Sequence, residues 1–122
     1  MGYVEVRPEH EGLRKAAEKQ DWAAVGALLA QNVAVQELEL GAFGSSMGPE
    51  GAAKVAAGLE KNTTLKEIDL GGNRIGAEGA AKVAAMLEKN TTLTSINLKN
   101  NGIGAEGAAL LMSLTIPSIT AA

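Results

Sequence analysis

Residues 65–80 read LKEIDLGGNRIGAEGA, and residues 93–108 read LTSINLKNNGIGAEGA. The two stretches align without a gap, and the second begins 28 residues after the first. An earlier copy starts at Val35, 30 residues before Leu65, with extra residues in the turn at 41–46. A fixed period in this range predicts a solenoid, in which each unit stacks on the next.

Each unit predicts one short strand followed by one helix. The strands are expected around 38–40, 68–70 and 96–98, where aliphatic and polar residues alternate. The helices are expected at 49–61, 77–89 and 105–114, where apolar residues recur at helical spacing. Because one such unit cannot bury its apolar face alone, we predict an α/β fold: a right-handed β-α solenoid, a short horseshoe segment with a concave parallel sheet and outer helices.

The repeats divide the chain into three parts. We assign residues 1–32 to an N-terminal helical cap with a leading half-repeat, 33–114 to three repeats, and 115–122 to a C-terminal tail. Within the cap, Asp21 is suited to begin the second of two helices.

The C-terminal end of the solenoid is expected to be incompletely covered. Pro117 should stop the last helix, and no polar capping repeat follows it. The final layer, with Leu98, Ile103 and Leu111, should therefore stay partly open. Open solenoid ends tend to associate, so this end allows a homodimer.

The repeat carries a family resemblance. The pattern L-x-x-I-x-L-x-x-N-x-I-G-x-E-G-A, at 65–80 and 93–108, resembles the ribonuclease-inhibitor-like class of leucine-rich repeats. The phrase Asn-Thr-Thr-Leu at 62–65 and 90–93 resembles repeats of NOD-like receptors and related proteins. The resemblance implies a curved solenoid that binds proteins. The cysteines typical of vertebrate ribonuclease inhibitor are absent and the repeats are few, which argues against a direct inhibitor role.

The candidate binding residues are expected on the concave face. Side chains alternate across a strand, so the third and fifth positions of each strand pattern point away from the core and form stripes. Four carboxylates converge in the first two units, which favours a protein or peptide partner rich in Lys or Arg; a solvated acidic face without a ligand is the alternative. The candidate partner-binding residues are Glu37, Glu39, Glu67, Asp69, Ser95, Asn97 and Lys99.

One stretch mimics a nucleotide-binding motif. Residues 102–107 match G-x-G-x-x-G between a strand and a helix, as in dinucleotide-binding folds. The same turn in the preceding unit begins with Arg74, so the first glycine is not required by the repeat. We interpret the motif as a structural turn, in which Gly76 and Gly104 allow positive φ or close packing.

Repeated asparagines have structural interpretations. Asn73 and Asn101 should hydrogen-bond backbone groups of neighbouring turns and form a ladder. Asn62 and Asn90 fit the ends of helices, and each also begins an N-glycosylation sequon. Because glycosylation requires secretion, helix termination is the favoured interpretation.

The composition gives no support for an enzyme. His10 is the only histidine and the chain has no Cys, so a nucleophilic triad, a zinc site and a cofactor are not expected. The net charge of −3 and the pI near 5.2 argue against nucleic acid as a partner. Residues 1–10 lack the apolar run of a signal peptide, and no stretch approaches the roughly 18 apolar residues of a membrane span. We therefore expect a cytoplasmic protein without membrane contact.

We predict a protein-protein interaction module or scaffold fragment that binds its partner on the concave face. One alternative is a regulator resembling Ran GTPase-activating proteins, which would need a projecting loop residue; Arg74 is the only Arg in such a loop. Another alternative is a designed or consensus-like stable solenoid without a natural ligand, which fits the near identity of the last two units.

Overall fold

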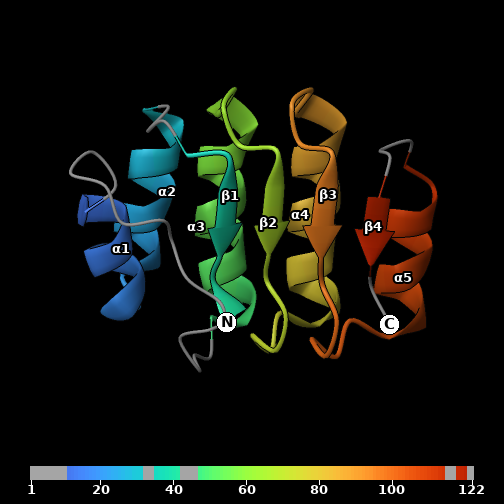
Figure 1. Ribbon diagram of the computed structural model, residues 1–122. Coiled ribbons are helices and arrows are strands. Elements are labelled where there is room, and N and C mark those ends of the chain that lie inside the picture. The colour runs from blue at the N-terminus through green and yellow to red at the C-terminus, as the bar shows by residue number, and fades with distance from the viewer. Residues whose placement is uncertain (1–10, 32–34, 42–46, 115–117, 121–122) are drawn as a thin grey trace.

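The computed structural model describes residues 11–31, 35–41, 47–114 and 118–120, and shows helices alternating with short strands (Figure 1). His10, Pro117, residues 1–10 of the expected cap and residues 121–122 of the expected tail lie outside this description. The elements, in chain order, are α1 (Glu11–Glu18), α2 (Trp22–Ala30), β1 (Glu37–Glu39), α3 (Gly48–Lys61), β2 (Glu67–Asp69), α4 (Gly76–Lys89), β3 (Ser95–Asn97), α5 (Gly104–Met112) and β4 (Ser118–Thr120).

The strands form one parallel sheet in the order β1-β2-β3-β4, and the helices form a layer on one side of it (Figure 1). The central residues of the strands are paired in register, Leu38 with Ile68, Ile68 with Ile96, and Ile96 with Ile119. The first three of these side chains are buried. The predicted β-α solenoid is therefore confirmed, because each unit contributes one aliphatic side chain to a continuous ladder under the sheet.

The helices pack closely because their contact positions carry Gly and Ala. A Cβ atom on Gly58 of α3 would lie only 2.1 Å from the backbone oxygen of Gly26 in α2. Between α4 and α5, a Cβ atom on Gly107 would lie 3.1 Å from the Cβ of Ala80. These small residues let neighbouring helices follow the narrow spacing that strands impose on the solenoid.

The turns from strand to helix are built as the repeat predicts. Gly76 and Gly104 begin α4 and α5 with φ of +71° and +72°, which is the left-handed region that favours glycine. The side-chain oxygen of Asn101 accepts a hydrogen bond from the backbone N–H of Asn73, one repeat earlier (2.7 Å). The Asn101 amide also donates to the carbonyl oxygen of Leu70 (2.9 Å). The predicted asparagine ladder is confirmed.

Asn62 and Asn90 end α3 and α4 and are both buried. The Asn62 amide donates to the Leu29 carbonyl oxygen at the end of α2 (2.8 Å), and the Asn90 amide donates to that of Leu59 in α3 (2.7 Å). Their side-chain oxygens accept N–H bonds from the chain that follows, at Leu65 and Leu93 respectively. These amides are held in the interior, which confirms the helix-end interpretation over the sequon.

At the N-terminal end, α2 packs against α3, and α1 packs against α2. The Asp21 carboxylate accepts a hydrogen bond from the backbone N–H of Ala24 (3.1 Å), so Asp21 caps α2 as predicted. Leu13, Ala16 and Ala17 are the buried side of α1.

The C-terminal end differs from the prediction. Ser118–Thr120, assigned to a tail, forms β4 and continues the parallel sheet. Leu98, Ile103 and Leu111, expected to be partly open, are 1%, 5% and 0% exposed. Ile119 packs against this core, which is why the last layer is closed where the repeat pattern alone leaves it open.

Candidate protein-binding face

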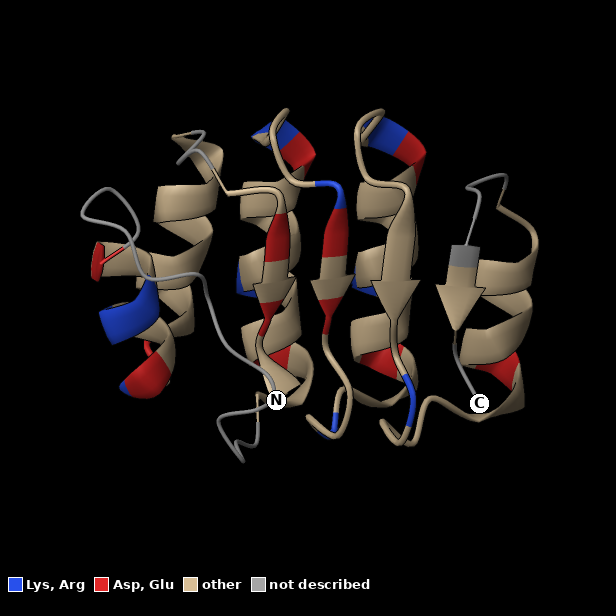
Figure 2. Cartoon of the chain, in the orientation of Figure 1, with Lys and Arg blue, Asp and Glu red and all other residues tan. Residues whose placement is uncertain are grey.

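The face of the sheet away from the helices carries two rows of side chains. The strand register aligns Glu37, Glu67 and Ser95 in what we term the first row. The second row consists of Glu39, Asp69, Asn97 and Thr120. Figure 2 shows the acidic residues of both rows on β1 and β2, whereas β3 carries no charge. The structure thus brings together the predicted carboxylates, and it concentrates them at one end of the sheet.

Glu37 and Glu67 of the first row are exposed. Among the described residues, no side chain forms an ion pair or hydrogen bond with either carboxylate. Adjacent strands lie about 4.8 Å apart, so two such charges in water repel each other by roughly 0.8 kcal/mol before salt screening. A cation placed between them would turn this repulsion into attraction to both.

The second row is partly structural, which the sequence analysis missed. A side-chain oxygen of Asp69 accepts a hydrogen bond from the backbone N–H of Gly71 (2.8 Å), and that of Asn97 accepts one from Lys99 (2.9 Å). A side-chain oxygen of Glu39 likewise accepts a hydrogen bond from the backbone N–H of Gly41 (3.1 Å). The sequence signal was an acidic or amide residue two positions before a turn, the spacing of an Asx-type turn.

Lys99 lies outside both rows. It follows β3 in the turn toward α5 and is exposed. Arg74, at the position equivalent to Gly102, lies in the turn between β2 and α4 and is exposed, with φ of +56°. Lys99 and Arg74 therefore lie beyond the C-terminal ends of the strands, away from Glu37 and Glu67 at the strand starts. At the strand starts, the exposed Lys66 directly precedes β2, and no ion pair joins it to either glutamate. The regulator alternative that depends on Arg74 stays a prediction.

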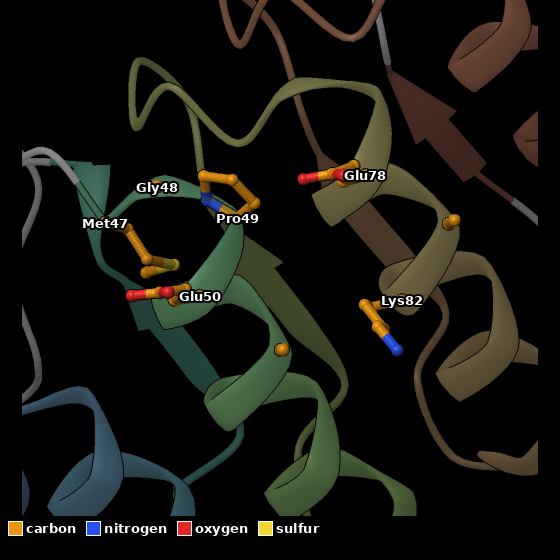
Figure 3. A pocket seen from close by; sticks show the side chains of 8 residues that line it. Met47, Gly48, Pro49, Glu50, Glu78 and Lys82 are labelled. Atoms are coloured by element: carbon orange, nitrogen blue, oxygen red, sulfur yellow. The ribbon is translucent and has the colours of Figure 1, made fainter.

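A hollow lies on the helix layer, between α3 and α4 (Figure 3). It has a volume of about 620 Å³, and the small side chains of Ala53 and Ala81 leave this space between the two helices. Pro49 and Glu50 of α3 and Glu78 and Lys82 of α4 lie along it. Its charged side chains are exposed, so the hollow holds no buried polar group to orient a ligand, and the sheet face is the stronger candidate.

Within the described ranges, no group of His, Cys, Asp and Glu is arranged to hold a metal ion. The G-x-G-x-x-G stretch is explained by packing, because Gly107 lies against Ile103 and Ala80. No described helix is long and apolar enough to cross a membrane. The cytoplasmic location stays a prediction.

Comparison with known proteins agrees with this architecture. Residues 61–84 and 89–112 match the family model described as Leucine Rich repeat. The fold is a leucine-rich-repeat solenoid. The solved structure titled "Leiomodin-1 Actin-Binding Site 2 (ABS2)" superimposes with a TM-score of 0.70, covering 96% of this chain and 80% of that one at 19% identity. A search of curated proteins gives no match. The ribonuclease-inhibitor-like subclass of this leucine-rich-repeat solenoid stays a prediction.

Proposed function

We propose that this leucine-rich-repeat solenoid is a protein-interaction module that binds a Lys- or Arg-bearing segment of a partner across the first row. The observation that carries the proposal is the pair of exposed, register-matched carboxylates of Glu37 and Glu67, with which no described side chain forms an ion pair. The leiomodin-1 neighbour, named as an actin-binding site, supports a binding role for this fold.

The expected mode of binding follows from the geometry of the two rows. A Lys ammonium group over the first row can contact both carboxylates at once, and the polar side chains of Ser95 and Asn97 can accept or donate hydrogen bonds beside it. Exposed ion pairs contribute only about 0.2–1 kcal/mol each. Affinity must therefore come from several such contacts, and binding should weaken as salt rises.

The test compares two pairs of glutamates from the same repeats. In E37Q/E67Q the charge is removed from the sheet face, and in E50Q/E78Q the same charge is removed from the exposed first turns of α3 and α4. Binding of a fluorescein-labelled oligolysine peptide is measured by fluorescence anisotropy at low and high salt. We expect about fivefold weaker binding for E37Q/E67Q, corresponding to roughly 1 kcal/mol, and wild-type binding for the control pair.

Equal weakening in both variants would show that net charge alone attracts the peptide, and it would refute the proposed site. Co-sedimentation with filamentous actin provides a natural protein as a second probe, chosen from the name of the structural neighbour. Loss of actin binding in E37Q/E67Q but not in E50Q/E78Q would support the same face, whereas no binding of either probe by the wild-type chain would contradict the proposal.

A further inference from the structure

One glycine of the G-x-G-x-x-G stretch has no counterpart in the repeat. Gly102 follows Asn101 in the turn between β3 and α5, whereas Arg74 follows Asn73 in the equivalent turn. A Cβ atom on Gly102 would meet nothing within 4 Å, so packing does not require a glycine here. The backbone does not require one either, because Arg74 adopts φ of +56°, close to the +61° of Gly102. The Asn-Gly pair, which occurs once in the sequence, is therefore a chemical feature that the fold itself does not explain.

An asparagine followed by glycine is prone to deamidation. The backbone nitrogen of the glycine loses its proton and attacks Cγ of the asparagine side chain. An N–Cγ bond forms, the Cγ–Nδ2 bond breaks, and Nδ2 takes up a proton and leaves as ammonia. Water then opens the succinimide ring at either carbonyl and gives aspartate or isoaspartate. Glycine favours this reaction because it has no side chain to hinder the attack and turns freely into the required conformation.

The folded turn keeps the Asn101 side chain from this reaction. Its amide donates hydrogen bonds to the carbonyl oxygens of Leu70 (2.9 Å), Leu98 (3.0 Å) and Lys99 (3.2 Å). Its oxygen accepts the backbone N–H of Asn73 (2.7 Å). These bonds hold the side chain in one orientation, and Asn101 is only 3% exposed, so water has little access to it. Deamidation therefore requires that the turn first opens.

The product of deamidation does not fit the closed turn. An ionised aspartate only accepts hydrogen bonds, whereas the Nδ2 position of Asn101 faces three carbonyl oxygens, which are acceptors themselves. Isoaspartate adds a carbon atom to the backbone of a turn in which the Asn101 carbonyl oxygen accepts the N–H of Gly76 (2.9 Å). Either product therefore opposes closing of the turn.

We propose that Asn101 is a self-modification site that the folded solenoid protects, and that its deamidation after opening prevents the turn of the third repeat from closing again. The reactants are the backbone nitrogen of Gly102 and water. Asn73 belongs to the same ladder and is also buried, but the side chain of Arg74 hinders the attack there. A chain that is held open thus loses the ability to refold, at a rate set by one Asn-Gly pair.

The test exchanges the residues that follow the two ladder asparagines. G102R gives the third repeat the Asn-Arg pair of the second, and R74G gives the second repeat the Asn-Gly pair of the third. The wild-type chain and both variants are incubated at mildly alkaline pH in guanidinium chloride and, in parallel, in native buffer. Tandem mass spectrometry then locates the gain of about one mass unit that marks deamidation at each asparagine. Circular dichroism checks that each variant folds before the incubation.

In guanidinium chloride we expect deamidation of the wild-type chain at Asn101, little at this residue in G102R, and an additional site at Asn73 in R74G. In native buffer, the wild-type chain should react at least about tenfold more slowly, the factor that about 1.4 kcal/mol of opening free energy gives. After return to native buffer, the deamidated chain should melt about 10 °C lower or more.

Three results would each overturn the proposal. Equal rates in the two buffers would show that the fold does not protect Asn101. Reaction of G102R at Asn101 as fast as in the wild-type chain would show that the glycine is not the cause. An unchanged melting temperature of the deamidated chain would show that the turn accepts the product. Asn101→Asp, which carries the aspartate form alone, repeats this last measurement without the incubation, and a melting temperature equal to that of the wild-type chain would again contradict the proposal.

Discussion

Replacing Asn101 with alanine removes the side chain that ties two successive turns together. Its oxygen accepts the backbone N–H of Asn73 at 2.7 Å, and its amide donates to the carbonyl oxygens of Leu70 and Leu98 at 2.9 and 3.0 Å. Asn101 is 3% exposed, so water does not readily replace these bonds. The Leu70 oxygen keeps a second donor, the amide of Asn73 (3.0 Å).

The Asn73 N–H and the Leu98 carbonyl therefore lose the short bond that Asn101 supplies. A hydrogen bond contributes about 1 kcal/mol net to stability. The three short bonds of the Asn101 side chain therefore give an expected loss of about 3 kcal/mol in the free energy of unfolding, a large share of the 5–15 kcal/mol typical of a domain. For a chain of this length the melting temperature should fall by about 10 °C.

The assay is urea unfolding followed by far-ultraviolet circular dichroism and by the fluorescence of Trp22, which reports on the opposite end of the solenoid. Lys99→Ala is the control, since this exposed side chain belongs to the same turn and its loss should change stability by less than about 0.5 kcal/mol. If Asn101→Ala unfolds within 1 kcal/mol of the Lys99→Ala control, the turn ladder does not stabilise the fold as argued.

Two further pairs of substitutions test the helices. Gly58→Ala should destabilise the chain by about 2 kcal/mol or more, because the new Cβ meets the Gly26 backbone oxygen. Gly12→Ala, whose Cβ would meet only the Leu28 side chain at an ordinary contact distance of 3.9 Å, should instead stabilise by up to about 1 kcal/mol. Thermal denaturation gives the sign of the change in melting temperature for each variant. A higher melting temperature for Gly58→Ala would contradict the close contact. Asp21→Ala should cost about 1 kcal/mol and Asp21→Asn much less, measured as amide hydrogen exchange in α2, and equal exchange in both variants would exclude capping by the side-chain oxygen.

Much of the fold could be predicted because each repeat carries the same local pattern of strand, turn and helix residues. The alternation around Ile68 and Ile96 predicts strands, and the structure pairs these residues in register. Asn73 and Asn101 recur at the same point of the turn, so their ladder could be inferred before any contact was known. The acidic positions of the first row could be found in the same way, because parallel strands in register place equivalent residues of successive repeats side by side.

The sequence was a poorer guide where residues depart from the repeat. Ser118–Thr120 lacks the leucine-rich pattern, and its place in the sheet depends on Ile119 meeting a core already formed by other units. The hydrogen bonds of Asp69 and Asn97 to their own turns depend on backbone directions that residue types alone do not fix. These bonds separate the partly structural second row from the first row.

By itself, the sequence determined the period, the order of strand and helix, and which side chains face the core, because these follow from local alternation and from repetition. Only the tertiary structure decided which acidic side chains of the sheet face are engaged by their own turns and which are exposed without an ion pair. The physical reason is that exposure and pairing depend on how the units stack: Glu37 and Glu67 come side by side only when β1 and β2 pair in register, and Asp69 accepts the Gly71 N–H only in the folded turn.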